Sequence, residues 1–188
     1  MKELSDVLMA IAPFSPALLE GILQGFTERR LLKYEYYAQE GEYCSRIALL
    51  NQGVMRAFYR NREGSEYNKI FFMENSLVAG YASLISGRVN AINIQCLTDC
   101  LVWEADYNTI RRMGGTYPVV ESFFRVLAES LYLKKEKKQI EQVMMSGAER
   151  YESFQIEFPE LEKRIPQYHI ASYLGITPTQ LSRIRARR

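Results

Sequence analysis

Histidine and cysteine are scarce in this chain of 188 residues, which contains one histidine, His169, and three cysteines. A structural zinc site needs about four such ligands, and a histidine-based hydrolase would have only His169 to work with. The odd number of cysteines argues against a disulfide framework and favours a reducing, cytoplasmic location. The composition therefore disfavours zinc enzymes and histidine-based hydrolases, and it predicts no bound metal.

Long apolar runs are also absent. No uninterrupted apolar stretch reaches the length of a membrane-spanning helix, and residues 1–6 lack the basic flank and apolar core of a secretory signal. We therefore expect no membrane association. With 47% hydrophobic and 24% charged residues, the composition is that of a packed protein with one large or two small domains.

The net charge is only +2, but basic residues are concentrated near the C-terminus. Residues 163–188 contain six basic residues and no acidic one, whereas residues 1–162 contain 18 basic and 22 acidic residues. A basic end on a near-neutral body is typical of a protein that presents this end to a polyanion. A solubilising basic tail is the alternative that charge alone leaves open.

The order of patterns predicts helices, then strands, then helices again. Helical spacing over residues 3–26, interrupted by two prolines, indicates two short helices. From residue 27 to about 107, short apolar or alternating runs are separated by turn residues, which predicts a β roll, sandwich or barrel. Residues 80–86 within this region predict a short helical insert.

A long helix is predicted to begin at Pro118 and to continue beyond residue 140. Its apolar residues follow the four-three-four spacing of a coiled-coil seam, and a helix of nearly thirty residues would extend about 40 Å. We expect its apolar stripe to pair with a second copy of the chain, because the β domain is too small to cover it. A helix folded back over the roll is the alternative. The predicted dimer interface consists of Val120, Phe123, Phe124, Leu127 and Leu131.

The most specific local pattern lies in residues 166–184. A helix is predicted to end at Leu174, Gly175 supplies a left-handed position, and Thr177 and Pro178 begin a second helix. This is the spacing of a helix-turn-helix, and its second helix ends in arginines, so we expect it to bind double-stranded DNA. A helical hairpin with a basic face is the alternative. The predicted DNA-binding residues are Thr177, Pro178, Thr179, Gln180, Ser182, Arg183, Arg185, Arg187 and Arg188.

The roles within the second helix are divided between base edges and phosphates. Arg183 suits a bidentate contact to guanine, with a phosphate contact as the alternative. Gln180 either reads a base or closes a capping box with Thr177 at its own helix end. The serine and the other arginines suit phosphates, and His169 is expected to be a packing or phosphate-facing residue.

The C-terminal motif reads Ile170-Ala171-x-x-Leu174-Gly175-Ile176-Thr177-x-x-x-Leu181-Ser182-Arg183-Ile184. This motif, together with roll turns at residues 40–42, 50–53 and 61–64, resembles the Crp/Fnr superfamily of bacterial transcription regulators, in its short Bacteroidetes-type branch. The resemblance covers essentially the whole chain. It implies an α+β fold with an antiparallel β-roll of the double-stranded β-helix or jelly-roll type. N-terminal helices, a long dimerisation helix and a C-terminal helix-turn-helix domain complete that fold.

The resemblance also implies three functional parts and a symmetric dimer. Residues 1–115 would form a cyclic-nucleotide-binding-like sensor domain, residues 116–145 the dimerisation helix, and residues 146–188 the DNA-binding domain. The dimer would bind a palindromic promoter site, with recognition helices in successive major grooves about 34 Å apart. RNA polymerase is a further expected partner. Many relatives carry a β-wing after the recognition helix, and the terminal arginines are expected to replace it here.

A small-molecule pocket is implied at the short insert, where relatives use a Gly-Glu pair and an Arg-Ser or Arg-Thr pair to hold a cyclic nucleotide. The first pair is here Gly80-Tyr81, and Asn90-Ala91 best matches the second; Arg88 reaches the site only if its loop shifts. We expect cyclic AMP binding to be absent or very weak, because an uncharged pocket does not replace the lost solvation of a phosphate. An unidentified neutral effector and an unliganded scaffold are both left open. The candidate pocket residues are Gly80, Tyr81, Ala82, Ser83, Arg88, Asn90 and Ala91.

The sequence thus predicts a dimeric DNA-binding regulator that is not an enzyme and has no cofactor. Cys44, Cys96 and Cys100 are expected to be buried, inert thiols, because the N-terminal cysteine cluster of iron–sulfur relatives is missing. A sensor module that acts through protein partners is one alternative, and it predicts retained pocket charges. A small-barrel enzyme such as a cupin is another, and it predicts a metal cluster of histidines and carboxylates on the strands.

Overall fold

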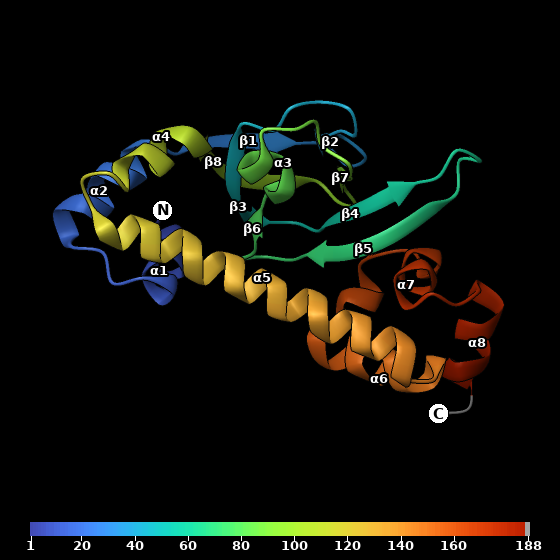
Figure 1. Cartoon of the computed structure of the whole chain (residues 1–188). Helices are drawn as coiled ribbons and strands as arrows, with labels where there is room; N and C mark the ends of the chain where they lie inside the picture. Colours follow the sequence, from blue (N-terminus) through green and yellow to red (C-terminus); the bar gives the residue numbers. More distant parts are fainter. Residues whose placement is uncertain (187–188) are drawn as a thin grey trace. The chain divides into compact units, whose positions relative to one another are not determined.

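The computed structural model describes residues 1–186 and confirms the α+β class predicted from the sequence (Figure 1). The chain forms two compact units, of which the first contains residues 1–57 and 71–130. The second contains residues 58–70 and the chain from Leu131 onward. These units divide the chain differently from the functional parts predicted above, because one β-hairpin groups with the C-terminal helices and one long helix contributes to both units.

The strands form two four-stranded sheets, with the orders β1-β8-β3-β6 and β2-β7-β4-β5. Except for β4 and β5, which form a hairpin, neighbouring strands in both sheets are far apart in sequence, as a β-roll requires. For example, β8 pairs antiparallel with both β1 and β3. The strands are β1 (Thr27–Leu31), β2 (Tyr36–Ala38), β3 (Arg46–Gln52), β4 (Met55–Arg60), β5 (Glu66–Phe72), β6 (Leu77–Val78), β7 (Asn93–Cys96) and β8 (Cys100–Asp106).

Apolar residues of the strands fill the roll, and a glycine closes one of its turns. Leu31, Leu49, Leu50 and Ile94 are at most 1% exposed. Gly53, between β3 and β4, has a φ of +107°, and a side chain there would lie 2.5 Å from the carbonyl oxygen of Asp99. The predicted turn at this position therefore requires glycine.

Short helices and the beginning of a long one complete the first unit. Ser15 and Asp106 cap two of them by accepting hydrogen bonds from backbone N–H groups three residues later. These helices are α1 (Lys2–Ile11), α2 (Pro16–Gln24), α3 (Tyr81–Ser86), α4 (Tyr107–Met113) and the N-terminal half of α5 (Pro118–Met144).

The residues predicted to form the dimer seam are largely buried within the chain itself. The rings of Phe123 and Phe14 pack at a tilt with centroids 5.7 Å apart, and the rings of Phe124 and Tyr107 pack edge to face at 5.2 Å. This part of α5 therefore packs on its own unit, and its apolar face is covered within the single chain. Leu131 is half-buried. The side chains that are at most 7% exposed are Val120, Phe123, Phe124 and Leu127.

The second unit is built around an aromatic core. Phe154 is 1% exposed, and its ring lies 5.6 Å from that of Phe158 and 5.8 Å from that of Tyr173. Ser146 and Glu149 close a capping box at the start of α6. The elements of this unit are the β4–β5 hairpin (58–70), the C-terminal half of α5, α6 (Gly147–Glu157), the 3-10 turn Leu161–Lys163, α7 (Gln167–Leu174) and α8 (Pro178–Ala186).

Lys138 on α5 is a lysine whose side chain is half-buried in this unit. Its Nζ lies 3.4 Å from the centroid of the Tyr173 ring on α7. Burial lowers the pKa of Lys138 to about 8, although the nearby carboxylates of Glu141 and Glu157 oppose the shift. The folded protein therefore favours the neutral amine between this value and the ordinary lysine pKa of about 10.4.

We expect Lys138 alone to raise the free energy of unfolding by about 1–2 kcal/mol between pH 8 and pH 10. In this range the unfolded chain binds a proton at Lys138 that the folded chain releases, so this contribution rises with pH. The raised pKa values of Cys44, Cys96 and Tyr173 act in the opposite direction, so the Lys138 contribution is measured as the difference between the wild type and Lys138→Met. Urea titrations at the two pH values measure the effect. Lys138→Met should abolish it, whereas replacement of the exposed Lys135 by methionine should leave it unchanged.

Candidate nucleic-acid interface and roll pocket

The turn between α7 and α8 has the predicted helix-turn-helix geometry. Gly175 ends α7 in the left-handed conformation, with a φ of +67°. Its N–H donates to the carbonyl of Ser172, and the N–H of Ile176 donates to that of Ala171 at 3.0 Å. These bonds satisfy carbonyls at the end of α7 and turn the chain into α8.

Gln180 forms the predicted capping box. The Thr177 N–H donates to Oε1 of Gln180 at 2.9 Å, and the Gln180 N–H donates to Oγ1 of Thr177 at 3.2 Å. Both side chains therefore stabilise the first turn of α8. Base reading by Gln180 stays a prediction, and its carboxamide nitrogen is the group left for it.

One side of α8 is packed and the other is exposed. Leu181 is fully buried, as are Ile170, Ala171 and Leu174 on α7, so the two helices share an apolar core. Arg187 and Arg188 lie outside the described residues. The exposed predicted DNA-binding residues are Thr177, Pro178, Thr179, Gln180, Ser182, Arg183 and Arg185.

An open hollow of about 410 Å³ lies along the second helix of the motif. Its walls include Gly147 and Ala148 at the N-terminus of α6 and Arg183 on α8. Arg150 also lines it and joins α6 to the end of α7, because its Nε donates to the Leu174 carbonyl at 2.9 Å. The free N–H groups of a helix start and a guanidinium together favour an anion.

Arg185 is partly engaged within the chain. Its Nε lies 3.9 Å from a carboxylate oxygen of Glu162, which also accepts a hydrogen bond from the Tyr151 hydroxyl at 2.6 Å. Arg183 and Arg185 thus differ in their surroundings. A phosphate contact by Arg185 would compete with Glu162.

The candidate pocket residues of the roll lie around α3, and its buried polar groups bond to the chain itself. Ser83 donates to the Arg88 carbonyl at 2.6 Å and accepts from the Cys44 N–H at 3.2 Å. The Asn90 carboxamide donates to the carbonyl of Ile92. Both side chains are at most 4% exposed. Their hydrogen-bonding capacity is therefore largely used without a ligand.

The other pocket residues surround these two without adding a buried charge. Gly80 faces the Cys44 sulfur and the Asn90 side chain so closely that no Cβ would fit there. The Tyr81 hydroxyl donates to the Phe124 carbonyl at 3.4 Å. Ala82, Arg88 and Ala91 are exposed. Among the seven candidate pocket residues, the buried side chains offer neutral hydrogen-bonding groups, and the one cation, Arg88, is exposed.

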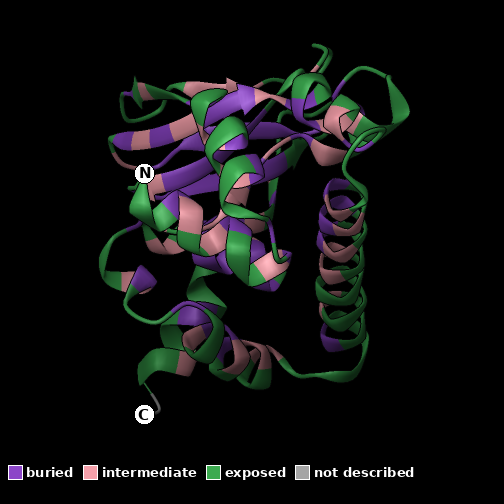
Figure 2. Cartoon of the chain, turned by 90° about the vertical axis from the view of Figure 1, so that its left-hand side faces the viewer, coloured by how far each residue is buried: buried purple, intermediate pink, exposed green. Residues whose placement is uncertain are grey.

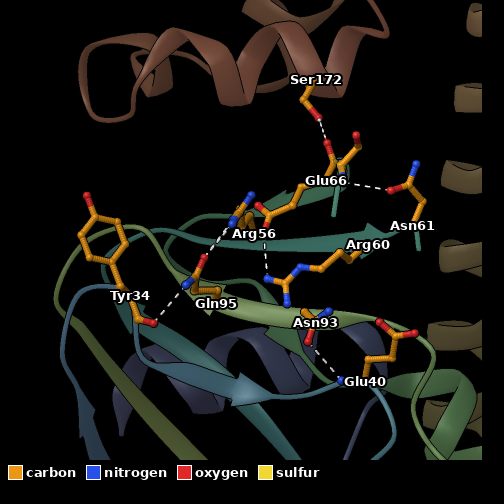
Figure 3. A network of polar contacts seen from close by, with 10 residues as sticks. Tyr34, Glu40, Arg56, Arg60, Asn61, Glu66, Asn93, Gln95 and Ser172 are labelled. Atoms are coloured by element: carbon orange, nitrogen blue, oxygen red, sulfur yellow. Dashed lines mark hydrogen bonds and ion pairs between the residues drawn. The ribbon is translucent and has the colours of Figure 1, made fainter. Parts of the chain in front are cut away.

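Sequence reasoning did not single out two charged residues inside the roll strands. Arg56 is 5% exposed and donates to Oε1 of Gln95 at 2.7 Å, and Gln95 in turn donates to the Tyr34 carbonyl (Figure 3). Glu104 is 6% exposed and lies 3.4 Å from a guanidinium nitrogen of Arg46. The sequence feature that could have identified both residues is a charged side chain within an otherwise apolar strand.

Cys96 and Cys100 are at most 4% exposed, so both are buried as expected, and Cys44 is half-buried. The Cys100 thiol donates to the Thr98 carbonyl at 3.3 Å. Within residues 1–186, no cluster of three metal-ligating side chains is found. No helix in this range is both long enough and apolar enough to cross a bilayer.

No protein-family model matches the chain, and no curated protein matches it. Several solved structures, however, are similar to this chain in fold. FixK2 from Bradyrhizobium japonicum is 18% identical, with a TM-score of 0.76 over 86% of this chain and 83% of that one. The c-di-GMP-responsive global regulator CLP of Xanthomonas campestris is 14% identical, with a TM-score of 0.72 over 92% and 91%. A Eubacterium rectale protein described as a transcriptional regulator of the crp/fnr family is 17% identical, with a TM-score of 0.73 over 93% and 85%.

Proposed function

We propose that this chain is a dimeric, sequence-specific DNA-binding regulator of transcription, of the Crp/Fnr type and without enzymatic activity. The observation that carries the proposal is α8, which packs on α7 through Leu181 and exposes polar and basic side chains on its other side. A helix of this kind fits the major groove. The named regulators that share the fold support the transcriptional role, with RNA polymerase as a partner.

Within this function Arg183 reads a base edge, and the hollow beside it receives the DNA backbone. Arg183 is exposed on α8 and lines the hollow together with the N-terminus of α6. A phosphate there would accept hydrogen bonds from the N–H groups of Gly147 and Ala148. Ser182 and Arg185 contact neighbouring phosphates, and Thr179 faces the groove.

The dimer is held by the face of α5 that its own chain leaves uncovered. Figure 2 colours the chain by burial and marks exposed positions in green. Leu133 and Ile140 are 66% and 53% exposed and lie one heptad apart, and Val143 is 77% exposed. Lys138, in contrast, lies on the face that packs against α7. The exposed stripe of Leu133, Ile140 and Val143 therefore replaces the seam predicted from the sequence.

The roll does not bind cyclic AMP in this proposal. We expect calorimetric titration of the purified protein with cyclic AMP to show no heat of binding. The cyclic phosphate would lose water without gaining a cation, because Tyr81 and Asn90 occupy the family's charged positions. Micromolar affinity would contradict this interpretation of the pocket. A neutral effector, or no effector, is consistent with the internal bonds of Ser83 and Asn90.

Selection of genomic DNA fragments with the purified full-length protein tests the function. We expect a recovered palindrome whose half-sites are about 10 base pairs apart, the spacing of two recognition helices on one face of the duplex. Arg183→Ala serves as the matched variant and should recover the palindrome poorly. Failure of the wild-type protein to enrich any sequence over random fragments would refute the proposal.

A further inference from the structure

The β4–β5 hairpin, 58–70, meets the first helix of the helix-turn-helix. Strand β5 is at the edge of its sheet, so within the described residues one side of its backbone has no partner strand. There the Ser172 hydroxyl donates to the Glu66 carbonyl at 3.0 Å (Figure 3). The same hydroxyl accepts from the Asn68 N–H at 3.0 Å. One side chain of α7 thus satisfies two backbone groups of β5.

A second set of bonds joins the same elements through the side chain of Asn68. Its Nδ2 donates to the His169 carbonyl at 2.8 Å and lies 3.3 Å from the His169 ring nitrogen Nδ1. Asn68 and His169 are 7% and 3% exposed. A buried carboxamide is stable only where its partners are in place, so this contact permits one register of α7 on β5.

The hairpin also has bonds of its own. Arg60 and Glu66 form an ion pair across it at 2.8 Å (Figure 3), and the side-chain oxygen of Asn61 accepts hydrogen bonds from two backbone N–H groups of the turn. Gly64 has a φ of +85°, as a tight turn requires. These bonds do not involve α7, so they stabilise the hairpin independently of its contacts with that helix.

We propose that Asn68 and Ser172 are positioning residues for DNA binding, and that the hairpin fixes the orientation of α7 and hence of α8. This inference rests on the proposed function. A dimer engages both half-sites together only if each recognition helix is held near its place before binding, because a loosely held second helix has a lower effective concentration at its half-site. Residues about one hundred positions before the motif would thereby control palindrome binding.

Hydrogen exchange of the Asn68 backbone amide tests the contact without DNA. In the wild-type protein this N–H should be protected although it lies on an edge strand. Ser172→Ala should accelerate its exchange by about tenfold or more, because the hydroxyl acceptor is lost. Ser172→Thr, which keeps a hydroxyl, should retain most of the protection, and Ser65→Ala in the exposed turn should change nothing. Equal exchange in Ser172→Ala and the wild type would overturn the contact.

DNA binding of the same full-length variants tests the positioning role. Ser172→Ala and Asn68→Ala should weaken binding to the palindrome by about tenfold but hardly change binding to a single half-site. Equal losses on both DNAs would overturn the positioning role, as would tighter binding by Ser172→Ala. Loss of Asn68 amide protection when the wild-type protein binds DNA would also overturn it. A wild-type protein that binds no DNA refutes the proposed function and this role together, while the exchange data still report the contact.

Discussion

Replacing Arg183 with alanine is expected to weaken binding to the specific site by about tenfold to a hundredfold and to remove base preference at one position of each half-site. Arg183 is exposed on α8 and lines the hollow beside it, so its guanidinium is free to reach the groove. A bidentate guanine contact loses both its hydrogen bonds on truncation. Fluorescence anisotropy on a set of single-base variants of the site measures the change.

Arg185→Ala is the matched control, since it removes the same charge from the same helix. Arg185 lies near Glu162, so its loss should weaken specific and random DNA binding about equally and by a smaller factor. The salt dependence of binding should decrease by about one unit per lost phosphate contact. If Arg183→Ala also weakened all sequences equally, Arg183 would be a phosphate contact.

Replacing both Leu133 and Ile140 with glutamate is expected to convert the dimer into monomers. These side chains are more than half exposed in the single chain, so a partner copy is needed to cover them. Four glutamates in one interface would repel each other and lose the apolar contact. Light scattering during size-exclusion chromatography gives the mass, and affinity for the palindrome should decrease by about a hundredfold or more, as avidity is lost.

Ala128→Glu is the control for this experiment, because Ala128 is exposed on α5 outside the stripe. It should leave both the dimer and DNA binding unchanged. Leu127→Glu, in contrast, would place a charge in the core of the first unit and should lower the stability of the fold. A dimer that survives the double substitution, or a wild-type protein that is a monomer, would contradict the assignment of the interface.

The helix-turn-helix is the part of the candidate site that local sequence patterns predict well. Gly175 and the pair Thr177 and Gln180 act within their own turn, so their conformations follow from backbone preferences and side-chain caps. The core formed with Leu181 follows from helical spacing, which brings apolar residues to one side. The exposed side of α8 could therefore be predicted from the order of residues alone.

The long helix α5 shows what local sequence patterns could not predict. Apolar spacing predicted a stripe on α5 but could not tell which surface covers it, because a helix face buries equally well against its own chain or a second one. Phe14 and Tyr107, distant in sequence, occupy that face. Leu133 and Ile140 remain exposed.

By itself, therefore, the sequence determined the class of fold, the order of its elements, the turns and caps, and the neutral residues Tyr81 and Asn90 at the candidate pocket. All of these depend on neighbouring residues or on the presence of a residue type. Only the tertiary structure decided which face of α5 is covered, that Ser83 and Asn90 bond to the chain itself, and that Asn68 meets Ser172. These features join residues far apart in the chain, and such contacts depend on how elements pack in three dimensions, which no local pattern encodes.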